Sequence, residues 1–98
     1  KDELNKSKNF FEKVISLDNN YLNANLALAK IYERQNNYEQ AKIFYKKTLS
    51  IKKDFILANQ IYGKFLIKIG EINKGQYYNY KYSGIIRFND KGVNIINE

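Results

Sequence analysis

The chain repeats itself at an interval of 34 residues. In the copy from Leu22 to Asp54, apolar residues recur at steps of three and four in two runs, which Asn36 and Asn37 separate. Such spacing is typical of two amphipathic helices joined by a tight turn. A shift of 34 positions aligns similar residues: Phe10 with Phe44 and Tyr78, Phe11 with Tyr45, Lys13 with Lys47 and Lys81, Ala24 with Ala58, Asn25 with Asn59, and Lys30 with Lys64. A helix pair that recurs in phase predicts an all-α fold, an α-solenoid of antiparallel helix pairs.

Five helices are predicted from apolar periodicity and from the residues that end helices. They cover residues 4–17, 22–35, 38–52, 55–69 and 71–83. Asp18, Asn19 and Asn20 end the first helix, because their side chains compete for backbone hydrogen bonds. Gly70 ends the fourth, since glycine accepts the left-handed conformation that often follows a helix. The fifth helix is expected to be the weakest, because Gly75 in its interior costs about 1 kcal/mol relative to alanine.

The pattern changes after Ser83. Residues 85–88 (IIRF) and 93–96 (VNII) are rich in β-formers, and a turn-forming NDKG segment lies between them. This order predicts a short β-hairpin. An isolated hairpin is only marginally stable in water. We therefore expect a C-terminal hairpin or irregular cap that covers the open end of the stack, with pairing to another chain or the start of a further domain as alternatives.

The central copy carries the motif of a known repeat family. The motif reads W-x2-L-G-x2-Y in the first helix, A-x3-F in the second, and then P. Its positions are matched by Leu28, Ala29, Tyr32, Ala41 and Tyr45. The copy thus resembles a tetratricopeptide repeat (TPR), with alanine for the glycine and tyrosine for the phenylalanine. It departs from the motif at Asn25, which stands in the tryptophan position and is expected to leave less apolar filling, and at Lys53, which replaces the proline.

The resemblance continues in both directions and covers about residues 1–86. Tyr62, Gly63 and Leu66 fit the following copy, while Gly75 and Asn79 replace its small and aromatic pair. The expected organisation is a single TPR-like domain over residues 1–98, with about two and a half units. Residues 1–20 form the second helix of a truncated unit, 21–54 a full unit, 55–86 a degenerate unit, and 87–98 a tail or cap. Because the first unit is incomplete, we expect a longer parent protein.

The resemblance implies a protein–protein interaction module. TPR proteins line a concave groove with the first helix of each pair, and the groove holds a peptide. The matching positions here are Asn23, Leu26, Lys30, Arg34, Leu57, Gln60, Lys64 and Lys68. Two pairs of cations recur in phase among them, which favours an acidic peptide. Glu33 lies beside the first pair and is expected to neutralise it in part. The alternative is a solvated helix face in a lysine-rich chain.

Composition excludes several kinds of site. The chain has 98 residues, a formal net charge of +7, and no cysteine or histidine. Disulfides, thiol nucleophiles, imidazole bases and zinc sites are therefore not expected. The carboxylates are scattered rather than paired in an apolar cleft, so we expect no enzyme activity and no cofactor. No apolar run approaches the roughly 20 residues that span a bilayer. We expect a soluble chain and favour the cytoplasm, although the sequence leaves the compartment open.

Two other functions remain as alternatives. The repeats could mediate self-association, or serve as a structural scaffold for an attached catalytic or membrane domain. The chain could also bind single-stranded nucleic acid, because Tyr77, Tyr78, Tyr80 and Tyr82 lie among cations, and aromatic rings stack on bases. Tyr78 and Tyr82 follow the phase of the repeat, however. This favours a packing role for them, so nucleic acid is not the expected partner.

Overall fold

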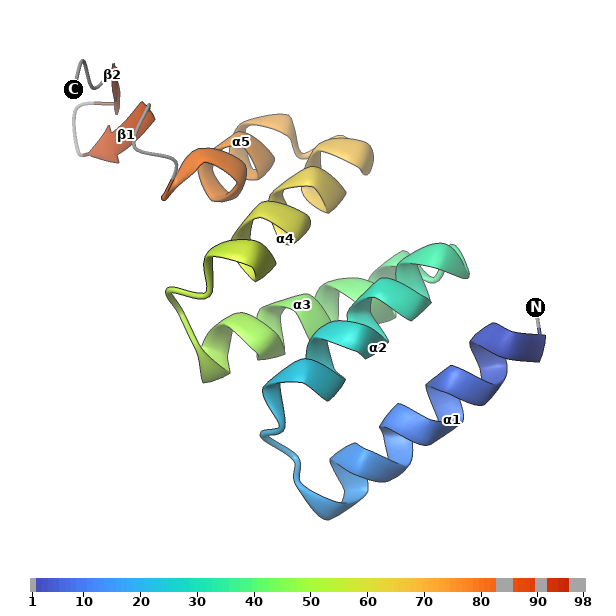
Figure 1. Cartoon of the computed structure of the whole chain (residues 1–98). Coiled ribbons are helices and arrows are strands. Elements are labelled where there is room, and N and C mark those ends of the chain that lie inside the picture. Colours follow the sequence, from blue (N-terminus) through green and yellow to red (C-terminus); the bar gives the residue numbers. More distant parts are fainter. Residues whose placement is uncertain (1, 83–85, 90–91, 96–98) are drawn as a thin grey trace. The chain divides into compact units, whose positions relative to one another are not determined.

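The computed structural model describes residues 2–82, 86–89 and 92–95. In this part of the chain five helices precede two short strands (Figure 1). They are α1 (Asp2–Leu17), α2 (Leu22–Arg34), α3 (Tyr38–Ile51), α4 (Ile56–Lys68), α5 (Ile72–Tyr80), β1 (Ile86–Asn89) and β2 (Gly92–Ile95). Each predicted helix is present, and the all-α fold built from helix pairs is confirmed.

The chain forms two compact units, residues 1–53 and 54–98. In the first unit α2 packs against both α1 and α3, and in the second α4 packs against α5. The strands β1 and β2 pair antiparallel, with Ile86 opposite Ile95 and Asn89 opposite Gly92. A hairpin-like strand pair is therefore present where the sequence predicted one. The residues of the connecting turn, 90 and 91, lie outside the described part.

Each turn between paired helices contains a residue with positive φ at the equivalent position. Asn36 has φ 61° after α2, and Gly70, 34 positions later, has φ 97° after α4. In each turn the next residue donates its backbone N–H to the carbonyl five residues back, at 2.9 Å for Asn37 and 2.8 Å for Glu71. These bonds satisfy carbonyl groups that the end of a helix leaves without partners. The turn geometry thus repeats with the sequence and makes each pair antiparallel.

Small residues at the crossing point let paired helices approach closely. In the first unit Ala29 of α2 and Ala41 of α3 are both fully buried. Gly63 and Gly75 hold the same two positions in the second unit. A Cβ atom built on Gly75 would lie 2.6 Å from the carbonyl oxygen of Gly63. Gly75 is therefore a packing requirement of the α4–α5 pair as well as a source of helix weakness.

Asn25, in the tryptophan position of the motif, is buried and hydrogen-bonded. Its side chain is fully buried, and its Nδ2 atom donates to the carbonyl oxygens of Tyr21, at 2.8 Å, and Asn19, at 3.2 Å. Asn59 is also buried and donates to the carbonyl oxygen of Phe55 at 2.8 Å. The asparagine amide thus ties the start of α2, and of α4, to the preceding loop.

Several apolar residues that were expected on buried faces are exposed. Phe10 is 62% exposed and Leu17 is 87% exposed, because no described helix of the first unit covers that side of α1. Tyr38 and Ile56 are also exposed, since each is the first residue of its helix and lies at the edge of the pair. Amphipathic spacing placed Phe10 and Leu17 on a buried face of α1, and for these two residues the prediction is wrong, because spacing does not show whether a neighbour packs there.

Candidate functional site

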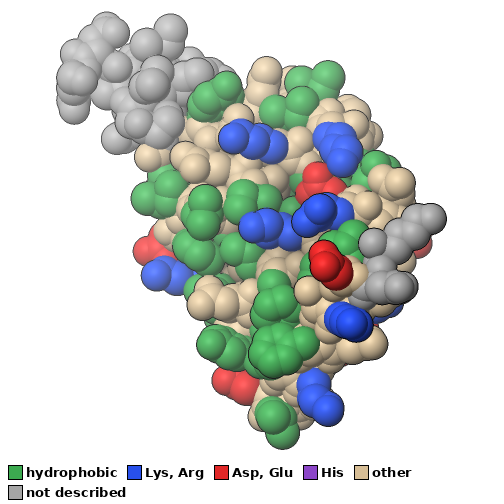
Figure 2. Space-filling model, turned by 45° about the vertical axis from the view of Figure 1, so that its right-hand side comes forward, with side chains coloured by type: hydrophobic (Ala, Val, Ile, Leu, Met, Phe, Trp, Pro, Cys, Tyr) green, Lys and Arg blue, Asp and Glu red, His purple; other side chains and the backbone are tan. Residues whose placement is uncertain are grey.

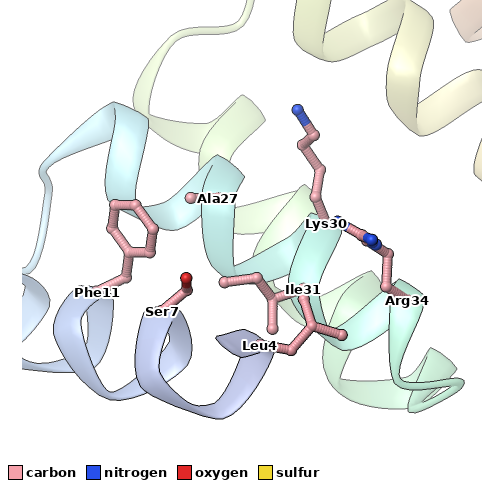
Figure 3. A pocket seen from close by; sticks show the side chains of 7 residues that line it. All are labelled: Leu4, Ser7, Phe11, Ala27, Lys30, Ile31 and Arg34. Atoms are coloured by element: carbon pink, nitrogen blue, oxygen red, sulfur yellow. The ribbon is translucent and has the colours of Figure 1, made fainter. Parts of the chain in front are cut away.

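A cavity of about 230 Å³ lies between α1 and α2 in the first unit. Its walls come from Leu4, Ser7 and Phe11 of α1 and from Ala27, Lys30, Ile31 and Arg34 of α2. Figure 3 shows Phe11 at one end of the cavity and the Leu4 and Ile31 side chains at the other. The apolar walls with two cations beside them suit a ligand that combines an apolar group with a negative charge.

Lys30 and Arg34 are the cations of this cavity. Both are exposed and lie four residues apart, so they share one face of α2. In the part of the chain that the structure describes, neither side chain forms an ion pair or a hydrogen bond. Lys and Arg side chains lie beside exposed hydrophobic ones on the face drawn in Figure 2. Both cations thus lie exposed beside the cavity.

The other two predicted positions on α2 differ from each other. Asn23 is exposed at the start of the helix, whereas Leu26 is only 7% exposed. A side chain that is already buried offers little area to a partner. The structure brings Lys30 and Arg34 together with the cavity, and it places Leu26 in the core.

The remaining four predicted residues lie on α4 in the second unit. Lys64 and Lys68 are exposed, Leu57 is 53% exposed, and Gln60 is half-buried. They follow the same three- and four-residue spacing as their counterparts on α2, so they share one helix face. The second unit thus has a cationic helix face of the same kind.

Glu33 has a structural partner within the first unit. Its carboxylate oxygen accepts a hydrogen bond of 2.7 Å from the hydroxyl of Tyr45, which is buried in the α2–α3 pair. Burial, reinforced by this hydrogen bond and by the negative charge of Glu33, raises the pKa of Tyr45 well above its ordinary value. Glu33 therefore also contacts α3, a contact that the sequence did not indicate.

The aromatic and cationic stretch at the end of α5 is packed against its own unit. The Tyr78 ring lies 4.9 Å from the Tyr62 ring, centroid to centroid. The Nζ atom of Lys81 lies 5.1 Å from the ring centre of Tyr77 and 5.4 Å from that of Tyr82. Each of these cation–π contacts occupies one face of its ring.

The contribution of α1 to the wall of the cavity was not predicted from the sequence. Ser7 and Phe11 align with Ala41 and Tyr45, the small and aromatic positions of the motif. In the α2–α3 pair these positions face the first helix. This signal was present in the 34-residue alignment, and it would have located the α1 wall.

Neither a metal-binding cluster nor a membrane-spanning helix is found among the described residues. In the ranges 2–82, 86–89 and 92–95, no three His, Cys, Asp or Glu residues are grouped as metal ligands would be. Within the same ranges, no helix combines the length and the apolar character needed to cross a membrane.

Comparisons with known proteins agree with the fold and with the motif. The family model described as "Tetratricopeptide repeat" matches residues 2–65. The uncharacterized protein ycf37 of Porphyra purpurea is 43% identical over 58 residues, which are 59% of this chain and 34% of that protein. The crystal structure of MamA resembles the chain with a TM-score of 0.74 at 29% identity, over 82% of this chain and 47% of that one.

The chain thus spans about a third to a half of the length of these two proteins. TPR proteins are in general non-enzymatic scaffolds that bind other proteins. The helix pairs, the 34-residue interval and the family match together show that the chain belongs to the tetratricopeptide repeat family, and hence to a class of protein–protein interaction modules.

Proposed function

We propose that the chain binds an acidic segment of a partner protein at the cavity between α1 and α2. Lys30 and Arg34 contact carboxylates of the segment, and the cavity receives one of its apolar side chains. The observation that carries this proposal is the position of two exposed cations, without ion pairs among the described residues, on the wall of a largely apolar cavity. Charge complementarity raises the rate of association and selects against basic partners.

The cationic face of α4 supports the same chemistry for the second unit. Lys64 and Lys68 are exposed there with the spacing of Lys30 and Arg34. Each unit therefore offers a cationic helix face to a partner with several acidic residues. The proposal itself rests on the first unit, where a cavity accompanies the cations.

A titration with charge-matched variants tests the proposal. A double variant, Lys30→Glu with Arg34→Glu, is compared with a control, Lys13→Glu with Lys46→Glu. Lys13 and Lys46 are also exposed but do not line the cavity. Each double variant replaces two cations by glutamate, so both change the net charge equally. We expect the cavity variant to weaken binding of a Glu-rich peptide with one leucine by about tenfold or more, because local charge pairs contribute more than the overall field.

The control variant should lose much less affinity. Amide shifts in the NMR spectrum of the unmodified chain should appear at Ser7, Phe11 and Ile31 during the titration. Equal losses in the two variants would show that only the overall positive charge attracts the peptide, and would refute a site at the cavity.

A further inference from the structure

Helix α2 has a single acidic residue, Glu33, and it lies beside both cations of the candidate site. Glu33 is three residues after Lys30 and directly before Arg34. Oppositely charged side chains that are three or four residues apart on a helix commonly pair. Lys30 nevertheless forms no ion pair among the residues that the structure describes. The position of the Glu33 carboxylate therefore decides how much positive charge the site presents.

The Glu33 carboxylate is bound to α3. Its Oε1 atom accepts a hydrogen bond of 2.7 Å from the hydroxyl of Tyr45, and such bonds to an ionised acceptor are the stronger kind. Tyr45 is 1% exposed, so close packing in the α2–α3 pair fixes the position of its ring and hydroxyl. Glu33 is half-buried, whereas Lys30 and Arg34 are exposed. A fixed donor in the core thus directs this carboxylate toward α3.

The second unit shows the same two positions with neither residue. Ile67 stands 34 residues after Glu33, and Asn79 stands 34 residues after Tyr45. Helix α4 contains no acidic residue, and the two lysines of its cationic face are exposed. An acid beside the cations therefore occurs in the copy that has the tyrosine, and both are replaced together in the other copy.

We propose that Tyr45 is a positioning residue for the acidic-segment site: it holds the Glu33 carboxylate toward α3 and so leaves Lys30 and Arg34 to the carboxylates of the partner. The proposal rests on the proposed function and names the residue that sets the charge of the same site. Tyr45 is buried and acts through Glu33. Without the tyrosine hydroxyl, the Glu33 side chain can turn toward Lys30, and the site then loses positive charge.

A double-mutant cycle tests the proposal with the Glu-rich peptide that contains one leucine. Tyr45→Phe keeps the ring but removes the hydroxyl, and Glu33→Gln keeps a hydrogen-bond acceptor but removes the charge. We expect Tyr45→Phe to weaken binding of the peptide about threefold, because an exposed charge pair contributes a factor of up to about five. Glu33→Gln alone should change the affinity by less than about twofold. The two substitutions together should return the affinity to within about twofold of that of the Glu33→Gln variant.

Asp18→Asn is the matched control for Glu33→Gln, because it also removes one negative charge. Asp18 is exposed in the loop before α2, at the end of that helix opposite to Arg34, and asparagine can still accept the hydrogen bond from the backbone N–H of Asn20. Asp18→Asn should not restore binding in the Tyr45→Phe background. Circular dichroism checks that each variant is folded at the temperature of the titration. A loss caused by weaker packing would not be restored by Glu33→Gln, so restoration distinguishes positioning from stability.

The outcomes separate this inference from the proposed function. If the peptide binds but Tyr45→Phe leaves its affinity unchanged, or lowers it in a way that Glu33→Gln does not restore, positioning by Tyr45 is refuted and the cationic site stands. Glu33→Gln alone gives a second test that does not require the Tyr45→Phe variant to fold. If it strengthens binding about fivefold while Asp18→Asn does not, the carboxylate already opposes the partner in the unmodified chain, and the inference is wrong. If the peptide does not bind at near-millimolar concentration, both proposals fail.

Discussion

At the scale of single residues, the two buried asparagines show how the family motif has been altered without loss of the fold. Asn25 and Asn59 stand where the motif has tryptophan, and each donates its side-chain amide to the carbonyl four residues earlier. These carbonyls also accept from the backbone N–H of the same asparagine, so the side-chain amide adds a second hydrogen bond to each. The polar side chain therefore stabilises the start of α2 and of α4 by hydrogen bonding, where tryptophan would stabilise it by apolar contact.

We predict that Asn25→Ala lowers the free energy of unfolding by about 1–2 kcal/mol, because the carbonyl oxygen of Asn19 loses a donor and a small cavity forms. Asn25→Leu should also destabilise the protein, although leucine is more apolar, since it cannot donate. Urea unfolding followed by circular dichroism measures both. The exposed neighbour Asn23→Ala serves as the control and should change stability by less than about 0.5 kcal/mol. A stabilising Asn25→Leu would show that apolar filling, rather than the hydrogen bonds, limits this position.

A second prediction at this scale concerns the left-handed turn residue. Gly70→Ala should destabilise the second unit by about 1–2 kcal/mol, because alanine is strained at φ 97°. Nothing lies within 4 Å of a Cβ atom at this position, so backbone conformation alone causes the loss. Gly70→Asn should cost less, since asparagine already occupies the equivalent turn at Asn36. Equal losses for the two variants in thermal melts would refute the conformational explanation.

At the scale of helices, the distance between paired helices is set by two small residues in each unit. The alanine pair at Ala29 and Ala41 and the glycine pair at Gly63 and Gly75 hold the same positions. The glycines let α4 and α5 approach more closely than side chains allow. A Cβ atom on Gly75 would also lie 2.6 Å from the Cγ1 atom of Ile67. The degenerate copy has thus lost motif residues but gained close contact between its backbones.

This arrangement predicts that Gly75→Ala destabilises the second unit by about 1–3 kcal/mol, although alanine favours a helix by about 1 kcal/mol over glycine. The steric cost exceeds the gain in propensity, because the nearest atoms include the backbone of Gly63. Gln76→Ala, at the exposed adjacent position of α5, is the matched control and should be neutral or slightly stabilising. Native-state hydrogen exchange at α4 and α5 distinguishes a loss in this unit. A Gly75→Ala variant as stable as the control would mean that the helices can move apart at no cost.

The helix boundaries and turns could be read from the sequence because they depend on local rules. Apolar spacing, Asn36 and Gly70 were sufficient to place α1 to α4 within about two residues. The exposure of Phe10 and Leu17 could not be predicted in this way, since burial depends on which element packs nearby. The cationic half of the candidate site followed from the positions of Lys30 and Arg34. The cavity required knowledge of the α1–α2 packing, which spacing alone does not give.

At the scale of the whole chain, composition determines where stability depends on pH. Histidine and cysteine are absent, so no side chain with an ordinary pKa between 6 and 8 is present. The groups that couple folding to pH in the alkaline range include two buried tyrosines, one in each unit. Burial, followed by the negative charges that Tyr78 and Glu71 contribute, raises the pKa of Tyr62 to about 12. Tyr45 is shifted in the same direction, with burial as the main cause.

We therefore predict that stability is nearly constant from pH 6 to 8 and falls above about pH 10. The unfolded chain releases the tyrosine protons near the ordinary value of 10.0, while the folded chain retains them to higher pH, so the folded state binds more protons and loses stability as pH rises. Tyr62→Phe should flatten this loss between pH 10 and 12 in thermal melts. The control is Tyr21→Phe at an exposed position, which should leave the profile unchanged.

Tyr45→Phe should flatten the loss too, but at neutral pH it should cost about 1–3 kcal/mol, because the hydrogen bond to the Glu33 carboxylate is removed. If the alkaline loss were the same in all three variants, ionisation of lysines or general repulsion would account for it, and the buried tyrosines would have no part in the pH dependence of folding.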